Sequence, residues 1–383
     1  MKVAMVVSHF QPEFGGHEFY LCKSLVKMGI DVTLYTSDRG RPGYSNEKFL
    51  NDNVSYEFEV KRFHAPLEIS EIPFCKGLKK ELNEDKFDII HSHEFFQVCS
   101  LTAYKVSKNK NLPFILTQHG SSPPINGFIR VGYLIDKNTV GKYIMKKADG
   151  IIALTPKVRN DLVNLGIPKT NIQVISTGVP IKRYSPNIES SLKKYVPDQE
   201  KVILFVGRLT ENKGVINLLK AFQKVRAHIH NVKLVVVGKG KMEIELKNLA
   251  RKLGIEKDTI FIRYVPQKDM PMIYAGADVF VLPTLYKEPF GIAAIEALSS
   301  GVPIVASNIG GLSLIVKNGE VGYLTKPGDI QEISSRIIQI LEDEKLRKNL
   351  AIRARERAII EFSWENKAEA VHRTYKKALS QHL

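Results

Sequence analysis

Short apolar runs alternate with amphipathic helical segments along most of this 383-residue chain. In the first half a helical pattern covers residues 18–28, and the apolar runs cover residues 3–7, 32–35, 89–91, 114–117 and 151–154. The second half starts the order again, with helical patterns at 215–227 and 243–253 and apolar runs at 202–206, 233–237, 260–262, 279–282 and 304–306. Strands that alternate with helices form parallel sheets with helical crossovers. The pattern therefore predicts an α/β protein with two Rossmann-like units.

The length of the chain also favours two domains, because one domain usually takes about 100–200 residues. Residues 178–197 are rich in proline, serine and charge and lack a clear period, which indicates a linker with a hinge near residue 180. We therefore expect one domain at 1–180 and a second at 181–362. The final helical pattern, 363–383, is expected to pack back on the first domain.

The sequence shows no sign of export or membrane insertion. No stretch approaches the about 20 consecutive apolar residues that span a bilayer, and the chain opens on the strand-like segment MKVAMVVSHF instead of a signal peptide. The cysteines Cys22, Cys75 and Cys99 are widely spaced, which argues against a disulfide framework or a zinc motif. We expect a cytoplasmic protein.

The formal net charge of +16 suggests anionic partners. Much of the excess lies at 345–357 and 367–377, where basic residues alternate with apolar and acidic ones as on solvated helix faces. Attraction of a nucleotide and peripheral contact with the inner face of a membrane are the alternatives. Nucleic acid is not an expected partner, because the chain has no aromatic and basic recognition motif.

Two carboxylates, Glu288 and Glu296, lie eight residues apart where the chain leaves an apolar strand, turns at Pro289 and Gly291 and enters a helix. A glutamate in the loop can accept hydrogen bonds from sugar hydroxyls, and one in the helix can bind ribose hydroxyls. The free amides of the helix N-terminus between them suit a phosphate. Taken alone, such a pair is more often a solvated loop acid and an acid favoured by the helix dipole.

A second pattern follows the apolar run 202–206, where Gly207, Arg208 and Lys213 precede a helix. Two cations at the carboxyl end of a strand, beside a helix N-terminus, could pair with the negative charges of a diphosphate, which number about two. The alternative is a surface arginine and lysine around a tight turn.

Together these segments resemble the retaining family-4 glycosyltransferases, also described as glycosyl transferases group 1. Residues 288–297, Glu-Pro-Phe-Gly-x4-Glu-Ala, resemble the E-x7-E motif of that family, and residues 207–214 resemble its G-R-x4-K-G diphosphate clamp. Gly15 and Gly16 look like part of its G-G-x-E loop, and residues 117–120, Thr-Gln-His-Gly, are similar to its T-x-H segment. Weaker similarity extends from residue 3 to about residue 362.

The resemblance implies the GT-B fold, in which two Rossmann-like domains with parallel sheets face each other across a cleft. It implies that the domain at 1–180 binds the acceptor and that the domain at 181–362 binds the nucleotide-sugar donor. It also implies a metal-independent enzyme without cofactor that moves a hexose-type sugar from a UDP-sugar or GDP-sugar with retention of configuration. One departure concerns Arg263, which stands where the family has a glycine beside the base pocket, so the base is left open.

The resemblance also implies roles for individual residues. Arg208 and Lys213, with nearby helix amides, would stabilise the departing nucleotide diphosphate, and Glu296 would hold the ribose. Glu288 would orient the sugar, which His119 would also reach. The expected catalytic residues are thus Arg208, Lys213, Glu288 and His119. The expected donor-binding residues are Gly15, Gly16, Gly207, Arg208, Lys213, Tyr264, Val265, Glu288, Phe290, Gly291, Ile292 and Glu296.

Two further segments have an open interpretation. His91 and His93 are metal-binding residue types, but we expect their side chains to diverge and not to share an ion, with one of them lining the cleft. Residues 125–147 mix apolar side chains with Arg130 and four lysines. Such a segment beside the cleft could touch a membrane and receive a lipid-linked acceptor, or it could be two ordinary helices that cover the sheet.

Other functions compete with glycosyl transfer. A nucleotide-sugar epimerase or a sugar phosphorylase could use the same architecture, although no lysine is recognisably placed to carry pyridoxal phosphate. A catalytically silent nucleotide-sugar-binding protein would keep Arg208 and Glu296 and show no turnover. A nucleic-acid binder would exploit the positive charge, with an affinity that falls steeply with salt.

Overall fold

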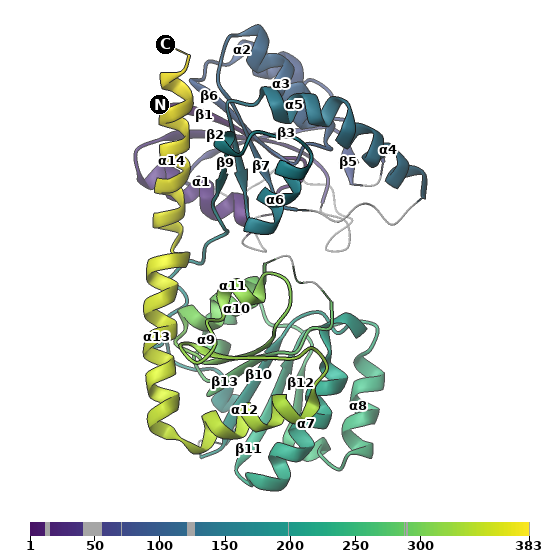
Figure 1. Ribbon diagram of the computed structural model, residues 1–383, viewed down its shortest axis with the longest axis vertical. Helices are drawn as coiled ribbons and strands as arrows, with labels where there is room; N and C mark the ends of the chain where they lie inside the picture. Colours follow the sequence, from purple (N-terminus) through teal and green to yellow (C-terminus); the bar gives the residue numbers. More distant parts are fainter. Residues whose placement is uncertain are drawn as a thin grey trace. The chain divides into compact units, whose positions relative to one another are not determined.

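The computed structural model describes residues 1–11, 16–40, 56–69, 71–120, 127–197, 199–286, 288 and 290–382. The chain divides into two compact units. Unit 1 comprises Met1–Gly178 and Trp364–Leu383, and unit 2 comprises Val179–Ser363. Each unit is a parallel sheet covered by helices (Figure 1).

Among the described residues of unit 1, seven parallel strands form a sheet in the order β3-β2-β1-β6-β7-β8-β9. The strands are β1 (Lys2–Val6), β2 (Asp31–Ser37), β3 (Glu59–Phe63), β6 (Ile89–His93), β7 (Phe114–Gln118), β8 (Gly150–Ala153) and β9 (Ile172–Val174). A small hairpin pairs β4 (Glu68–Ile69) with β5 (Ile72–Pro73). The strand order reverses between β1 and β6, which is where open α/β sheets bind ligands beyond the carboxyl ends of their strands.

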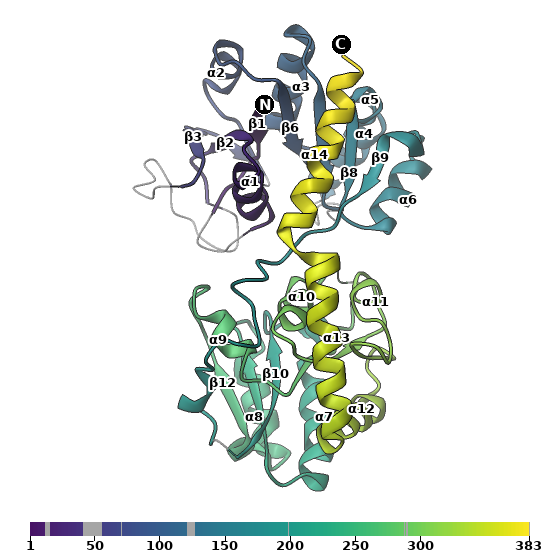
Figure 2. The same cartoon turned by 90° about the vertical axis from the view of Figure 1, so that its left-hand side faces the viewer.

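Strand β1 shows why both faces of this sheet are covered. Its side chains alternate, so Val3 and Met5 join one hydrophobic cluster and Ala4 and Val6 join another. The first face is covered by α1 (His17–Lys27) and α14 (Trp364–Ser380), which pack together (Figure 2). The opposite face is covered by α2 (Leu78–Glu84), α3 (Val98–Asn109), α4 (Gly127–Asn138), α5 (Val140–Lys147) and α6 (Pro156–Asn164).

In the described part of unit 2, six parallel strands form a sheet in the order β12-β11-β10-β13-β14-β15. These are β10 (Lys201–Val206), β11 (Val232–Val237), β12 (Thr259–Ile262), β13 (Val279–Leu282), β14 (Ile304–Ser307) and β15 (Gly322–Thr325). The helices are α7 (Val215–His228), α8 (Glu243–Lys252), α9 (Met270–Tyr274), α10 (Ile292–Ser299), α11 (Leu312–Ile315), α12 (Ile330–Glu342) and α13 (Glu344–Phe362). Helix α12 packs on α7, and α13 packs on α10. The strand order reverses between β10 and β13, so the expected two parallel sheets are confirmed.

Residues 179–197, expected to be a linker, contribute to the core of unit 2. Val179, Tyr184, Leu192 and Val196 are all buried there. The backbone N–H of Val179 donates to the carbonyl oxygen of Phe362 at 2.7 Å, which fastens the start of unit 2 to the end of α13.

Among the described residues, no helix combines the length and the apolar character that crossing a membrane requires.

Candidate active site

In unit 2 the loops that follow β10 and β13 meet where the strand order reverses. Lys213, at the end of the 3-10 helix η4 (Glu211–Lys213), donates a hydrogen bond from Nζ to Oε2 of Glu288. Both side chains are largely buried, with 15 % and 18 % of their surface exposed. The Asn212 carbonyl oxygen accepts from Thr284 Oγ1 at 2.9 Å and from the Leu285 N–H at 2.8 Å. The two loops are thus tied together beside the lysine–glutamate pair.

Arg208 lies in the same loop as Lys213, and its side chain is exposed. Among the described residues, its guanidinium has no hydrogen-bond or ion-pair partner. Because Glu288 already neutralises Lys213, Arg208 presents a charge that the described side chains do not offset. An anionic ligand at this edge of the sheet would find that charge available.

Glycines let these loops approach one another closely. A Cβ on Gly238 would lie 1.9 Å from the carbonyl oxygen of Gly207, and a Cβ on Gly214 would lie 2.0 Å from that of Pro283. Gly238 and Gly214 also have positive φ angles of 142° and 68°. Any side chain at these two positions would force the loops apart, which explains why both are glycine, Gly214 closing the 207–214 pattern.

The N-terminus of α10 lies in the loop region after β13. Its N-cap, Gly291, has φ 103°, and no side chain caps the helix in the described structure. Phe290 is buried and meets the ring of Phe362 edge-on at 6.1 Å, whereas Ile292 is 53 % exposed. Pro289, expected at this turn, lies outside the described residues.

Glu296, on α10, is surrounded by hydrogen-bond donors. The Tyr274 hydroxyl donates to Glu296 Oε2 at 2.9 Å, and Gln267 Nε2 donates to the Tyr184 hydroxyl at 3.1 Å. Arg183 donates to the carbonyl oxygen of Gln267. Burial raises the pKa of Glu296, although hydrogen bonds from Tyr184 and Tyr274 and the charge of Arg183 favour its carboxylate. The sequence patterns did not indicate Tyr184, Arg183, Gln267 and Tyr274 as neighbours of Glu296. The general rule that a buried carboxylate needs hydrogen-bond donors was the one signal that could have predicted such neighbours.

The loop after β12 contributes the remaining expected donor-binding residues, at the same carboxyl edge of the sheet. Tyr264 is 67 % exposed, and Val265 packs in part against the core of unit 2. Arg263, which replaces the expected glycine, is exposed, with its Nε 3.7 Å from Glu243 Oε2.

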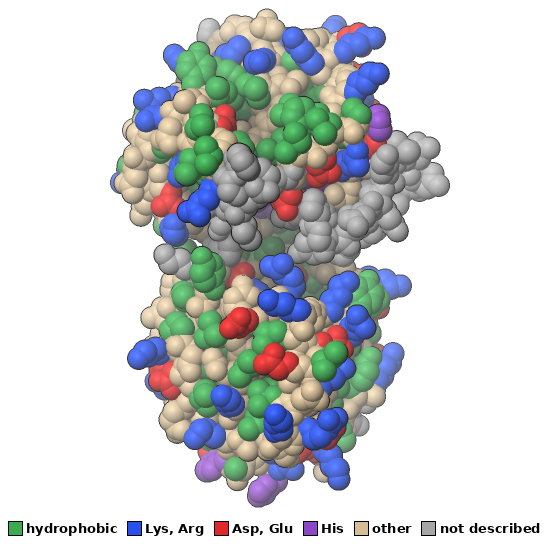
Figure 3. Space-filling view, turned by 90° about the vertical axis from the view of Figure 1, so that its right-hand side faces the viewer, with side chains coloured by type: hydrophobic (Ala, Val, Ile, Leu, Met, Phe, Trp, Pro, Cys, Tyr) green, Lys and Arg blue, Asp and Glu red, His purple; other side chains and the backbone are tan. Residues whose placement is uncertain are grey.

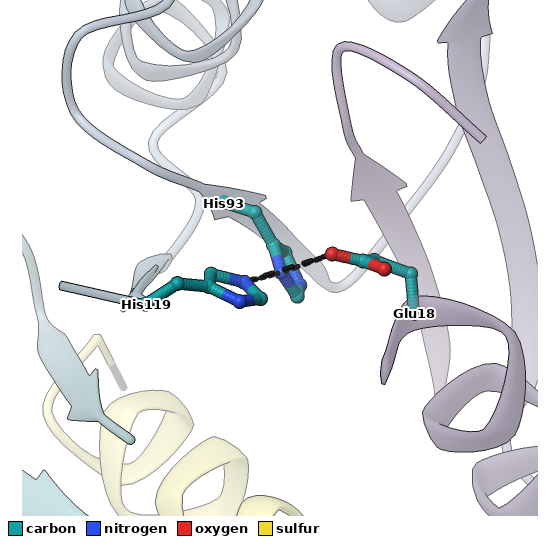
Figure 4. Close-up of side chains that lie close together, drawn as sticks. All are labelled: Glu18, His93 and His119. Carbon is teal, nitrogen blue, oxygen red and sulfur yellow. Dashed lines mark hydrogen bonds and ion pairs between the residues drawn. The ribbon is translucent and has the colours of Figure 1, made fainter. Parts of the chain in front are cut away.

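Unit 1 gathers three polar side chains at its own point of strand reversal (Figure 4). Glu18 lies in the first turn of α1, His93 ends β6, and His119 directly follows β7. His93 Nδ1 lies 2.9 Å from His119 Nε2, and Glu18 Oε1 lies 3.6 Å from each of these nitrogens. Of the three, the sequence patterns singled out only His119 as a site residue. Gly16 is the N-cap of α1, and Gly15 lies outside the described residues.

Glu94 holds His119 in place. Its Oε1 accepts a hydrogen bond from the backbone N–H of His119 at 2.9 Å, and its own N–H donates to the carbonyl oxygen of Thr117 at 2.8 Å. Glu94 has φ 63°, a left-handed conformation that costs a non-glycine residue about 1–2 kcal/mol. The surrounding structure therefore holds the end of β6 in an unfavourable conformation at this site.

The expectation that His91 and His93 diverge is wrong. Residues two apart on a strand share a face, and the two rings stack with centroids 4.9 Å apart. His91 is a buried, satisfied histidine, with Nδ1 2.6 Å from the Tyr375 hydroxyl and Nε2 2.7 Å from Thr117 Oγ1. Burial, and then the neighbouring histidine His119, lower the pKa of His91 to about 3. Burial and the other histidines also lower the pKa of His93.

Comparisons with known proteins cover both units. The model of the family described as Glycosyltransferase Family 4 matches residues 17–183, and that of Glycosyl transferases group 1 matches residues 187–357. An uncharacterised glycosyltransferase of Methanocaldococcus jannaschii is 28 % identical, over 99 % of this chain and 99 % of its own. A D-inositol 3-phosphate glycosyltransferase of Corynebacterium diphtheriae is 26 % identical, over 98 % of this chain and 94 % of its own.

The solved structures show the same architecture. Anabaena HepE, in complex with UDP, superposes with a TM-score of 0.78 at 20 % identity, over 98 % of this chain and 100 % of its own. With a fold shared over the whole length and two family models that cover most of both units, the chain belongs to the group 1, family-4 glycosyltransferases and is an enzyme of that class with their GT-B fold.

Proposed function

We propose that the protein transfers a hexose-type sugar from a UDP- or GDP-linked donor to an acceptor with retention of anomeric configuration. The observation that carries this proposal is the Lys213–Glu288 pair beside the exposed Arg208 in unit 2. Two cations suited to a diphosphate and a carboxylate suited to sugar hydroxyls lie on two joined loops. The solved complexes of HepE with UDP and with UDP-glucose support a nucleotide-sugar donor.

In the proposed reaction, the bond between the anomeric carbon and the donor phosphate oxygen breaks. The acceptor hydroxyl forms the new bond to that carbon on the same face, and its proton passes to the departing diphosphate. Arg208 and Lys213 stabilise the negative charge that develops on this leaving group. Glu288 orients the sugar through its hydroxyls, and His119 of unit 1 makes a further contact with the sugar.

Glu296 binds the donor ribose in this proposal. A carboxylate accepts hydrogen bonds from two vicinal hydroxyls, and Tyr274 fixes its Oε2 at 2.9 Å. Gly291 and the first amides of α10 lie between Glu288 and Glu296 in the sequence. They are therefore suited to bind the phosphates, which lie between the sugar and the ribose in the donor.

The reaction is tested by incubating the purified chain with a panel of UDP- and GDP-sugars and measuring released nucleoside diphosphate. The anomeric configuration of a product glycoside, determined by NMR, tests retention. An inverted product would contradict the retaining mechanism. Conversion of a donor to its epimer without diphosphate release would identify an epimerase instead, and donor binding without turnover would identify a silent binding protein.

We also propose that α4 and α5 meet an anionic membrane surface and receive a lipid-linked acceptor there, which would place the protein peripherally at the inner face of a membrane. The two helices expose five apolar side chains, each 44–59 % accessible: Val131, Leu134, Ile135, Val140 and Tyr143. Arg130, Lys146 and Lys147 are exposed on the same helices. Figure 3 shows apolar side chains on the viewer's face of unit 1. Exposed apolar side chains with cations on the same helices suit insertion among anionic headgroups.

Cosedimentation with vesicles tests this surface. The chain is expected to bind vesicles that contain anionic phospholipid, and the double variant Val131→Ser, Ile135→Ser is expected to lose most of that binding. Ile244→Ser is the matched control, because Ile244 is 76 % exposed on α8 of unit 2. Equal binding by the double variant and the wild type would argue against a membrane role for α4 and α5.

A further inference from the structure

In the cluster of Glu18, His93 and His119, the ring nitrogens and the carboxylate oxygen offer more hydrogen-bond acceptors than the cluster has protons to donate. His93 Nδ1 and His119 Nε2 lie 2.9 Å apart, so one shared proton serves both. Glu18 Oε1, at 3.6 Å from each nitrogen, is too far away for a good hydrogen bond to either. His93 Nε2 is buried and has no partner among the described residues, whichever ring nitrogen of His93 carries the proton.

The three atoms also have the spacing of metal ligands. A triangle with sides of 2.9, 3.6 and 3.6 Å has its centre about 2.0 Å from each corner. Zn²⁺ binds histidine nitrogen at about 2.0–2.1 Å and carboxylate oxygen at about 2.0–2.2 Å. A cation at or just outside the plane of the three atoms would therefore lie at bonding distance from all of them.

We propose that Glu18, His93 and His119 form a binding site for one divalent transition-metal ion, with Zn²⁺ the best match in chemistry. Two imidazoles and one carboxylate suit Zn²⁺, Co²⁺ or Ni²⁺, whereas Mg²⁺ prefers oxygen ligands. Three protein ligands leave further coordination positions open to water or to an oxygen of a bound molecule. The transfer reaction proposed above does not require this ion.

The ligands are held by contacts that do not depend on the ion. His93 stacks on His91, which Tyr375 and Thr117 fix from both sides. Glu94 holds the backbone of His119 at 2.9 Å. Such support from surrounding residues keeps ligands oriented for a metal and raises its affinity.

A further histidine lies beside the cluster. The ring of His17 is 5.1 Å from that of His119 and 5.7 Å from that of His93, centroid to centroid. Its Nδ1 is buried without a partner among the described residues. This ring nitrogen is an available hydrogen-bond partner for a molecule or water bound to the ion.

Because His119 is also a proposed contact of the donor sugar, the ion and the sugar would compete for the same side chain. This consequence rests on the proposed function: Zn²⁺ would then inhibit transfer. Metal binding is measured without any donor present. A negative result would therefore overturn the metal-site proposal and leave the transferase proposal untouched.

The test titrates tag-free, metal-stripped protein with Zn²⁺ in a calorimeter and with Co²⁺ in a spectrophotometer, where ligand-bound Co²⁺ shows visible absorption bands. We expect one ion per chain. Glu18→Gln and His119→Gln should each weaken metal binding by at least about tenfold. Even the loss of a residue that only supports a metal ligand typically weakens binding that much. His372→Gln, on α14 of the same unit, is the matched control and should leave the affinity unchanged.

Two variants are used so that a folding defect in one cannot decide the outcome, and far-UV circular dichroism checks each. Wild-type protein that binds no Zn²⁺ or Co²⁺ would overturn the proposal. Binding that neither Glu18→Gln nor His119→Gln weakens would also overturn it, because the ion would then lie elsewhere on the chain.

Discussion

At the scale of single residues, the spacing in the sequence indicated the charged groups of unit 2 but not their partners. Arg208, Lys213, Glu288 and Glu296 could be singled out because each follows a strand or begins a helix in a specific pattern. That Lys213 bonds Glu288, 75 positions further along the chain, depends on two strands being neighbours in a sheet. Such a pairing comes from topology and leaves no local signal.

Glu296 should be a residue where stability and binding oppose each other. Burial raises its pKa, so its stabilising contribution is present below the unfolded-state value of about 4.3 and is lost as pH rises through the raised folded-state value. At pH 8 we expect Glu296→Gln to melt above the wild type, by about 2–4 °C for each kcal/mol gained, with the difference vanishing near pH 3.5. Scanning calorimetry at both pH values measures this.

The same Glu296→Gln variant is expected to bind UDP or GDP about tenfold more weakly, because hydrogen bonds to a charged group are worth about 1.5–3 kcal/mol. Glu245→Gln is the control, since Glu245 is exposed on α8. A Glu296→Gln variant that melts lower at pH 8 yet keeps full nucleotide affinity would mean that Glu296 is a structural residue.

Arg208 should contribute both to donor binding and to turnover. Its exposed guanidinium has no partner among the described residues, so its removal should disturb the fold little. We expect Arg208→Ala to lower kcat/KM by about 10²–10³, the effect of deleting one group that stabilises transition-state charge. Steady-state kinetics with the donor measure this, with Arg353→Ala on α13 as the control. Unchanged kinetics in Arg208→Ala would remove Arg208 from the proposed clamp.

At the scale of elements, the central strands of both sheets and the edge strand β12 could be predicted, whereas the edge strands β3, β9 and β15 could not. The run 279–282 is observed as β13, and the helical patterns 215–227 and 243–253 are observed as α7 and α8. Central strands of a parallel sheet are apolar on both faces and stand out. The edge strand β3 has the sequence Glu-Val-Lys-Arg-Phe, in which charged residues hide the pattern. The edge strand β15, Gly-Tyr-Leu-Thr, begins with glycine, which is rare in strands and weakens the apolar signal.

Asp258 connects three elements of unit 2. Lying in the 3-10 helix η5 (Glu256–Asp258), it accepts hydrogen bonds from Arg226 Nε of α7 at 2.7 Å and Lys233 Nζ of β11 at 2.6 Å. Burial alone would raise the pKa of Asp258, but the hydrogen bonds from Lys233 and Arg226 outweigh burial and lower it. We expect Asp258→Asn to destabilise the protein at pH 7 by about 1–3 kcal/mol.

The sign of the pH dependence follows from the lowered pKa. The stability that Asp258 contributes is present above the unfolded-state value of about 3.9 and is lost as pH falls through the folded-state value. Thermal midpoints of wild type and Asp258→Asn should therefore converge in acid. Glu344→Gln is the control, because its pair with Lys348 is exposed to solvent and contributes little to stability. Equal midpoints for Asp258→Asn and the wild type at pH 7 would contradict this account.

At the scale of the whole molecule, the last helix, α14, belongs to unit 1, which also contains the first 178 residues. Helix α14 follows unit 2 in the sequence, yet Trp364, Val371, Tyr375 and Ala378 are buried in a hydrophobic cluster of unit 1. They cover one face of the sheet together with α1. Unit 1 therefore completes its core only after the residues of α14 have been synthesised.

Removal of residues 364–383 should accordingly weaken unit 1 and spare unit 2. In amide hydrogen exchange, we expect β1, β6, β7 and β8 to lose protection, because their apolar face would meet water, while β10 to β14 keep theirs. Removal of residues 381–383 alone is the control, since it leaves α14 (Trp364–Ser380) intact. Equal loss of protection in both units would contradict this assignment of α14.

The central claim is that unit 2 takes a nucleotide-sugar donor through Arg208, Lys213 and the glutamates beside them. The most direct test is a thermal-shift measurement of the purified chain against a panel of nucleoside diphosphates and nucleotide sugars. A ligand that binds only the folded state stabilises it by about 2.7 kcal/mol at a hundredfold excess over its Kd. The account predicts a selective rise in melting temperature with one nucleotide sugar, lost in Arg208→Ala. No shift with any member of the panel, or an equal shift in Arg208→Ala, would contradict it.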